Sequence, residues 1–307
     1  MVVSLPSTLF CWDEEENVNE AITMLKADMR DEHAAIIQYL QHAYAIGEGE
    51  EACEIEAIAR DEMRHLRWLA EMVVELGGDP TMERSEVDRS GAGPVEWMAR
   101  DIAAEEGAIA QYKEHIAAID IDNDNDNPRV VRLLKRILSD EVAHKEAFSD
   151  LAEELAEEAA EAEEAAQQGE AASPRVLEIL NQGVRHEYTV ILQYLYHSFV
   201  VPHCDVGREL DMQAINEMQH MGWLAEEVAE SGGHPRMEHA ELALEGDTTA
   251  MLEADIAAER EVTRVYGRQI AELEDAELKA LLTRIREHEI YHDELFNDLL
   301  ERVQERE

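Results

Sequence analysis

Residues 60–80 read RDEMRHLRWLAEMVVELGGDP, and the rest of the architecture follows from this segment. Its apolar spacing predicts a helix that ends at Gly77-Gly78, with Pro80 just beyond the end. Inside the helix, Glu62 and His65 are three residues apart, so their side chains share one face. The segment recurs as NEMQHMGWLAEEVAESGGHP at residues 216–235, at a constant offset of 155 residues. The chain therefore contains an internal repeat of two related halves.

The composition indicates a packed protein with a very acidic surface. The 307 residues are enough for two domains of about 150 residues each. Lys and Arg number 26 against 71 Asp and Glu, so the formal net charge is −45. A charge of this sign repels phosphate, which argues against nucleic acid or an anionic membrane as a partner, but it suits cations. The hydrophobic share of 45% is too high for a disordered acidic chain.

Such a surface predicts that the stability of the protein depends on salt, as in proteins from halophilic sources. The melting temperature is expected to rise from dilute buffer to molar KCl, because screening weakens the self-repulsion of the compact state. Circular dichroism melts over a KCl series measure this directly. A flat or falling curve would rule out the halophilic interpretation.

Cysteines and terminal patterns give expectations about the compartment. Cys11, Cys53 and Cys204 form no Cys-x-x-Cys pair, so we predict no thiolate metal site and expect small buried apolar residues. The N-terminus lacks the pattern of a signal peptide, and no run of about 18 apolar residues occurs. These features predict a cytoplasmic location and no membrane segment.

Helical spacing of apolar residues recurs in eight segments, whereas alternating β-branched runs are scarce. The predicted helices cover residues 17–47, 51–76, 95–119 and 129 onward in the first half, and 174–200, 206–231, 248–272 and 275–305 in the second. A long connection, 77–94 or 232–247, separates the second and third helices of each half. The fold class is therefore all-α, with two tandem four-helix bundles that each have one long crossover.

The bundles have predicted boundaries and two unusual connections. Residues 1–160 form the first bundle with a short lead-in at 1–16, residues 161–173 an acidic linker, and residues 174–307 the second bundle. Residues 120–128 alternate Asp and Asn like a calcium loop, but they lack the Gly at the sixth loop position and the Glu at the twelfth. We therefore interpret them as a polar turn.

The repeated helices carry two spaced motifs. Four His residues follow a Glu by three positions, on helices two and four of each half, and four Tyr residues follow a Glu by seven positions, on helices one and three. Seven residues are about two helical turns, so Glu and Tyr also share a face. The pairs are Glu62/His65, Glu141/His144, Glu217/His220 and Glu289/His292, then Glu32/Tyr39, Glu105/Tyr112, Glu187/Tyr194 and Glu259/Tyr266.

Four carboxylates and two imidazoles in each bundle predict a dinuclear metal site. Four buried carboxylates without a counter-charge would repel one another, whereas two divalent cations neutralise them. His nitrogen suits iron or manganese. One Glu-x-x-His in so acidic a chain is usually a solvated face, but four copies with four partner Glu favour metal binding. We expect the neighbours Asp61, Asp140, Glu106 and Glu261 at the surface, His33, His115, His186 and His288 outside the ligand set, and Trp68 and Trp223 in the core.

On these motifs each half resembles a ferritin-like domain, and residues 61–80 resemble the second helix of bacterioferritin. The resemblance implies two irons per bundle and oxidation of Fe(II) with oxygen or peroxide. The implied ligands are Glu32, Glu62, His65, Glu105, Glu141 and His144, then Glu187, Glu217, His220, Glu259, Glu289 and His292. In this interpretation Tyr39, Tyr112, Tyr194 and Tyr266 hydrogen-bond ligand carboxylates or supply an electron. The chain departs from cage ferritins by its fusion and by having no short fifth helix, and it lacks the Cys cluster of a rubrerythrin.

Two other functions fit the same residues. The ligands do not decide the metal, so a dimanganese catalase or another peroxidase remains open. Metal binding without turnover, as in iron storage or buffering, also remains open, and storage would require a closed shell of many chains.

A final feature concerns the residue that follows the second-helix Glu, which is Met63 in one half and Met218 in the other. In bacterioferritin, two subunits each give this Met to a shared haem at their two-fold axis. We expect the two halves to reuse that contact as a pseudo-dimer within one chain, and a higher oligomer remains possible. Met also fills apolar helix faces, so we expect packing residues and no haem, hence no Soret band in the purified protein.

Overall fold

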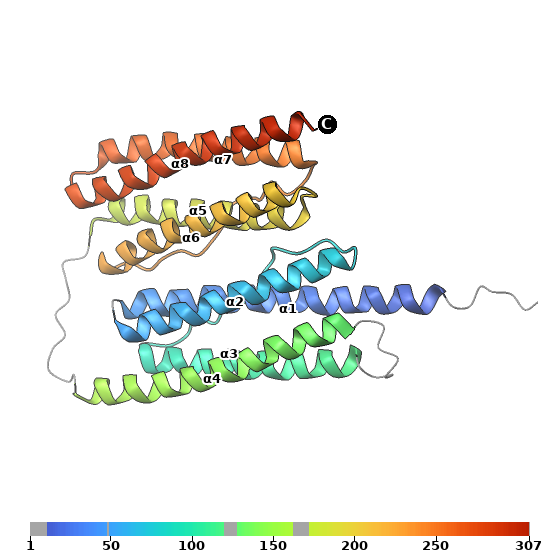
Figure 1. The fold of residues 1–307 in the computed structure, drawn as a ribbon. Coiled ribbons are helices and arrows are strands. Elements are labelled where there is room, and N and C mark those ends of the chain that lie inside the picture. Colours follow the sequence, from blue (N-terminus) through green and yellow to red (C-terminus); the bar gives the residue numbers. More distant parts are fainter. Residues whose placement is uncertain (1–10, 48, 120–127, 162–171, 307) are drawn as a thin grey trace, which may run out of the picture. The chain divides into compact units, whose positions relative to one another are not determined.

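The computed structural model describes residues 11–47, 49–119, 128–161 and 172–306, and every regular element within these ranges is a helix (Figure 1). Two compact units, residues 1–166 and 167–307, each contain four helices and are described separately. The helices are α1 (Cys11–Ile46), α2 (Glu50–Glu75), α3 (Pro94–Ile119), α4 (Pro128–Glu161), α5 (Pro174–Val200), α6 (Cys204–Glu230), α7 (Thr248–Glu272) and α8 (Ala276–Gln304). The prediction of an all-α chain with two tandem bundles is confirmed.

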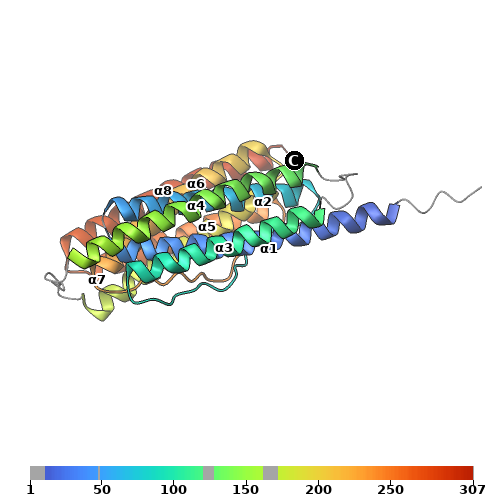
Figure 2. The same cartoon turned by 90° about the horizontal axis from the view of Figure 1, so that it is seen from below.

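Each unit closes into a bundle because every helix packs against two others. In the first unit α1 packs against α2 and α3, and α4 packs against α3 and α2, as two views show (Figures 1 and 2). In the second unit α5 packs against α6 and α7, and α8 against α7 and α6. Among the helices that the structure describes, none is long and apolar enough to span a membrane.

The Gly-Gly pairs end the second helix of each bundle as the sequence predicts. Gly77 has φ +83° and Gly232 has φ +75°, a left-handed conformation that side chains disfavour. The next amides turn back to the helix, because Gly78 donates to the Val73 carbonyl at 2.9 Å and Gly233 to the Val228 carbonyl at 2.8 Å. The chain leaves the helix here and enters the long crossover.

Side chains of the first helix in each unit hold the crossover in place. The Asp88 amide donates to Gln38 Oε1 at 3.2 Å, and the Ala243 amide donates to Gln193 Oε1 at 2.9 Å. Each Gln also donates to a buried Asp of the third helix, Asp101 or Asp255, at 2.8 Å. One amide side chain thus satisfies crossover backbone and joins it to two helices without a strand.

The structure corrects two expectations at the start of helices. Helix α1 begins at Cys11, so part of the expected lead-in is helical. Cys53 and Cys204 are exposed, so the expectation of buried cysteines is wrong for these two, while the Cys11 side chain lies outside the described part. Both exposed cysteines lie in the first turn of a helix, Cys53 in α2 and Cys204 in α6.

Other predictions fall outside the described residues. The acidic end of α4 is helical as far as Glu161. The Asp/Asn turn, apart from Pro128, and residues 162–171 of the predicted linker are not described.

Candidate metal centres

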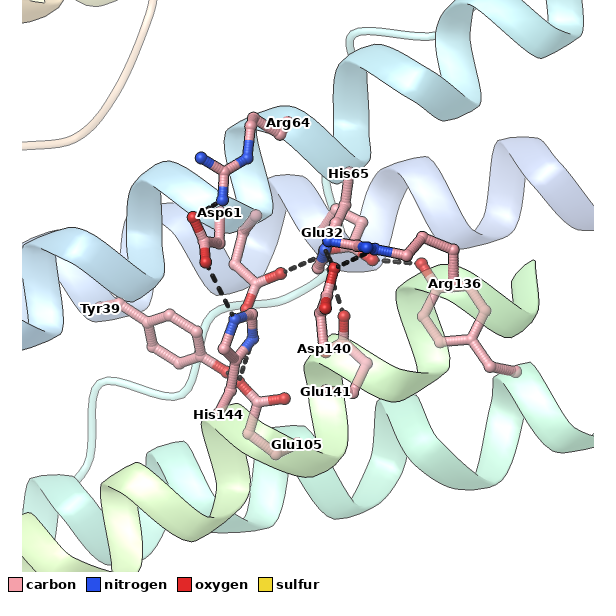
Figure 3. Close-up of polar contacts among 12 residues, drawn as sticks. Glu32, Tyr39, Asp61, Arg64, His65, Glu105, Arg136, Asp140, Glu141 and His144 are labelled. Atoms are coloured by element: carbon pink, nitrogen blue, oxygen red, sulfur yellow. Dashed lines mark hydrogen bonds and ion pairs between the residues drawn. The ribbon is translucent and has the colours of Figure 1, made fainter. Parts of the chain in front are cut away.

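The six predicted ligands of the first unit meet in the middle of its bundle, with one Glu from each helix (Figure 3). Their ligand atoms form two groups, each with all atoms within 4.8 Å of one another: Glu32, Glu62, His65 and Glu141, then Glu62, Glu105, Glu141 and His144. Glu62 and Glu141 belong to both groups. These two carboxylates would therefore lie between two cations, while Glu32 and Glu105 would each bind one.

The second unit repeats the arrangement with its own six residues. The groups are Glu187, Glu217, His220 and Glu289, then Glu217, Glu259, Glu289 and His292, again within 4.8 Å. Here Glu217 and Glu289 are shared. The structure thus brings together all twelve residues that the motifs singled out, as two sets of six.

Each of the four His residues points Nδ1 toward the shared carboxylates. His65 Nδ1 is 2.7 Å from Glu62 Oε2 and 2.9 Å from Glu141 Oε1, and His144 Nδ1 is 2.8 Å from Glu62 Oε1. The second unit has the same orientation: His220 Nδ1 is 2.7 Å from Glu217 Oε2, and His292 Nδ1 is 2.6 Å from Glu217 Oε1. Nδ1 is therefore the nitrogen available to a cation.

Many of the buried oxygens and nitrogens of these sets lack a hydrogen-bond partner. Within the described residues, twelve of the nineteen buried side-chain polar atoms without a hydrogen bond belong to the predicted ligands, including both carboxylate oxygens of Glu217 and of Glu289. Buried polar atoms are normally hydrogen-bonded, because losing water without replacement costs about 1–3 kcal/mol for each. Their concentration at two points, with carboxylate and imidazole donors, fits a pair of divalent cations in each unit.

In the first unit, burial favours the protonated form of the shared carboxyls when no cation is bound. Burial, with the neighbouring charge of Glu32, raises the pKa of Glu62 to about 7 and that of Glu141 to about 8. Burial alone lowers the pKa of His65, but hydrogen bonds to the carboxylates Glu141, Glu32 and Glu62 raise it overall. Cations that bind here must therefore displace protons.

The predicted tyrosines hydrogen-bond carboxylates, but across the bundle and not within their own helix. Tyr39 on α1 donates to Glu105 Oε1 on α3 at 2.7 Å, and Tyr112 on α3 donates to Glu32 on α1 (Figure 3 shows Tyr39 and Glu105). The second unit repeats the exchange, with Tyr194 bonded to Glu259 and Tyr266 to Glu187. The antiparallel pairing of the two helices brings each Glu opposite the Tyr of the other. All four hydroxyls thus hold Glu residues that serve a single cation position.

The sequence analysis did not predict the partners of the Nε2 atoms of His65 and His144. Asp61 and Asp140, expected at the surface, are only about one-third and one-quarter exposed. Asp140 Oδ2 lies 3.5 Å from His65 Nε2, and Asp61 Oδ2 lies 3.6 Å from His144 Nε2 (Figure 3). Both Asp residues directly precede a shared Glu, and this adjacency was the signal available in the sequence. A carboxylate at Nε2 fixes the ring and makes Nδ1 a stronger donor to a cation.

The two units differ at these positions. His288 takes the place of Asp140, and its Nδ1 lies 2.9 Å from His220 Nε2. Asn216 takes the place of Asp61. Arg136, which donates to Asp140 at 3.0 Å, corresponds to Arg284, which lies 4.1 Å above the Trp223 ring. The first centre therefore has two more carboxylates around it than the second.

Replacing Asp140 with Asn is expected to lower the affinity of the first centre for divalent cations by about tenfold, because it removes the charge behind His65. The change keeps the shape of the side chain, so folding should be unaffected. Competitive Mn(II) titration measures the affinity, and Asp150→Asn on the exposed face of α4 is the matched control. Equal affinities for the two variants would contradict this role.

The structure confirms one of the remaining expectations and contradicts another. Glu106 and Glu261 are exposed and pair with Lys145 and Arg264, as expected for surface residues. The expectation that Trp68 and Trp223 lie in the core is wrong: both are half-buried beside the metal-site rings, with ring centroids 5.8 and 5.7 Å from His65 and His220. Their three-residue spacing from His places each Trp on the same face of the helix as the neighbouring His. Met63 and Met218 are half-buried within their own units.

Comparisons with known proteins agree with the motifs. The family model of the ferritin-like domain matches residues 22–158 and 177–305. A bacterioferritin of Desulfovibrio desulfuricans is 29% identical over 143 residues, which are 45% of this chain and 78% of that protein. The X-ray structure of the bacterioferritin of that species, which concerns its diiron site in different catalytic states, is 26% identical with a TM-score of 0.44, and covers 47% of this chain and 84% of that one. A Mycobacterium tuberculosis bacterioferritin is 24% identical with a TM-score of 0.42, and covers 44% and 89%. The double match confirms the tandem resemblance.

Proposed function

This chain belongs to the ferritin-like domain family, and on that premise we propose that each of its bundles binds two iron ions and oxidises Fe(II) with oxygen or peroxide. The observation that carries the proposal is the complete set of six buried ligands in both units, with two shared carboxylates in each. Neither unit has lost a ligand, so both are proposed to be active.

The Glu and His ligands would have different roles in such a centre. Glu62 and Glu141 would lie between the two cations and hold them close together, while His65 and His144 would each complete the coordination of one cation. Burial of the ligands excludes water and strengthens each charge interaction. When bound, two Fe(II) ions supply one electron each to the oxidant, and one hydrogen peroxide takes both electrons with two protons to give two waters.

We propose that the tyrosines restrict the movement of the ligand carboxylates. Tyr39 and Tyr112 each bind a Glu that serves one position, so they limit how far that carboxylate can swing when the charge of the iron changes. Burial, then the adjacent Glu charge, raises the pKa of both hydroxyls well above the ordinary value, so both stay protonated as donors. Loss of one such bond is expected to disorder its Glu and not to empty the site.

An anaerobic loading experiment tests the proposed function. The chain is loaded with Fe(II), mixed with hydrogen peroxide or with oxygen, and followed by absorbance and Mössbauer spectroscopy. We expect rapid oxidation, with about two Fe(II) consumed for each peroxide. The control is the fourfold variant Glu62→Ala, His65→Ala, Glu217→Ala, His220→Ala. In its presence, Fe(II) should be oxidised no faster than in the same buffer without protein.

The same experiment on manganese-loaded protein decides the alternative. If manganese-loaded protein disproportionates peroxide into oxygen and water while the iron-loaded protein oxidises slowly, the function is that of a dimanganese catalase. If neither form turns over although both bind metal, the proposal fails and the chain is a metal-binding protein without redox turnover.

A further inference from the structure

A cavity in the first unit leads to the dinuclear centre from the side of α1, α3 and the crossover. Its volume is about 310 Å³, and its lining includes the ligands Glu32 and Glu141 with Tyr39 and Tyr112. Small residues make the space: Ala34, Ala35, Ala103, Ala104, Gly107 and Ala108 line it, and a Cβ on Gly107 would meet no atom within 4 Å. The cavity therefore connects residues outside the centre with its first ligand.

The charged residues of the lining are all acidic. Asp28, Asp31 and Glu86 add to the two Glu ligands, and among the described residues no Lys, Arg or His lines the cavity. Walls of one sign in a concave, poorly solvated space concentrate ions of the opposite sign. The cavity is therefore suited to cations.

One oxygen of Asp28 is buried without a partner. Its side chain is 2% exposed, and Oδ2 has no hydrogen-bond partner. The other oxygen, Oδ1, lies 2.8 Å from His115 Nδ1 and accepts from Gln111 Nε2 at 3.0 Å. Burial raises the pKa of Asp28, and the contacts with His115 and Gln111 oppose this rise. A buried oxygen that lines an acidic cavity without a partner calls for a positive ligand.

Asp31 lies close to Asp28 through a shared neighbour. Gln111 Nε2 donates to Asp31 Oδ2 at 2.7 Å as well as to Asp28. The amide oxygen and nitrogen of Gln111 exchange places by a simple flip, so the same side chain offers an oxygen when a cation is present. Two carboxylates and an amide oxygen are donors that hard divalent cations prefer.

The second unit lacks these residues at the equivalent positions. Glu32 corresponds to Glu187, so Asp28 and Asp31 correspond to Gly183 and His186; on the third helix Gln111 and His115 correspond to Val265 and Gln269. A Cβ on Gly183 would lie 2.8 Å from Leu224 Cδ1, so even a small side chain is crowded there. The acidic group is thus a property of the first unit alone and not of the repeat.

We propose that Asp28 and Asp31, with Gln111, form an additional binding site for a divalent cation in the first unit, through which Fe(II) reaches Glu32. This inference rests on the proposed function only for the identity of the cargo; the binding site itself is independent of turnover.

The number of bound ions tests the site. The parent variant Glu217→Ala, His220→Ala removes the second centre, and Mn(II) is counted by EPR titration in molar KCl, which suppresses diffuse binding to the acidic surface. We expect three ions in this parent and two after Asp28→Asn, Asp31→Asn is added. Asn keeps the side-chain shape, and Glu106→Gln, Glu114→Gln, which removes the same charge from the exposed face of α3, should leave three ions.

The rate of loading tests the route. Anaerobic Co(II) binding to the first centre, followed by its visible absorption, should slow about tenfold in Asp28→Asn, Asp31→Asn while the final occupancy of the centre is unchanged. A parent that binds only two ions, a variant that keeps three, or an unchanged loading rate would overturn this inference. A parent that fails to fill the first centre would instead overturn the proposed function, so the two failures are distinguishable.

Discussion

A chain with Glu62→Ala and His65→Ala is expected to hold two tightly bound metal ions in place of four. Glu62 serves both cation positions of the first unit, so its loss with His65 leaves one position with two Glu and the other with two Glu and one His. Such incomplete sets have too few ligands to hold a cation tightly, so both ions of the first unit should be lost. Metal analysis of the dialysed protein measures the change.

Two matched variants make the result specific. Glu217→Ala with His220→Ala should also halve the metal content, and spectra of the two variants should identify the centre that remains. Glu106→Ala replaces an exposed Glu beside the ligand Glu105 and should keep four ions. A Glu62→Ala, His65→Ala variant that still binds four ions would show that the ligand assignment is wrong.

Removal of metal is expected to lower the melting temperature by roughly 10 °C or more. A ligand at about 100 times its dissociation constant stabilises the folded state by roughly 2.7 kcal/mol per site, and about 1 kcal/mol corresponds to some 2–4 °C in a domain of this size. Each unit has two positions, so the effects add within a bundle. Calorimetry of chelator-treated and metal-loaded protein gives the difference.

This difference should widen as the pH rises from about 6 to about 8. In the metal-free protein, burial raises the pKa of Glu62 to about 7 and that of Glu141 to about 8, from an ordinary value of 4.5. These carboxyls bind protons more tightly in the folded chain than in the unfolded chain, so the metal-free first unit loses stability as the pH rises through this range. Cations displace those protons, so metal affinity increases over the same range. A difference that narrows toward pH 8 would contradict the account of the centre.

The sequence predicted the architecture because both of its main signals are local. The spacing of Glu62 and His65 places both on one helix face, and the Gly-Gly ends need only a left-handed residue such as Gly77. Repetition at an offset of 155 residues then showed that the spacing was not accidental. Nothing in these arguments needs long-range packing.

The features that the sequence did not predict depend on how helices pair. The spacing of Glu32 and Tyr39 placed both on one helix face but did not say which Glu the tyrosine meets, and the antiparallel register of α1 and α3 places Tyr39 beside Glu105. The sharing of Glu62 and Glu141 between two positions also requires four helices in place. The same holds for Asp140, because its contact with His65 requires α4 to pack against α2.

The central claim is that each half of the chain contains a complete dinuclear centre. Crystals of the metal-loaded protein, measured on both sides of the iron and manganese absorption edges, test it most directly. The account predicts four strong anomalous peaks per chain: one pair enclosed by Glu32, Glu62, His65, Glu105, Glu141 and His144, and the other by Glu187, Glu217, His220, Glu259, Glu289 and His292. Peaks in only one half, or a set of six ligands that encloses no pair of ions, would contradict it.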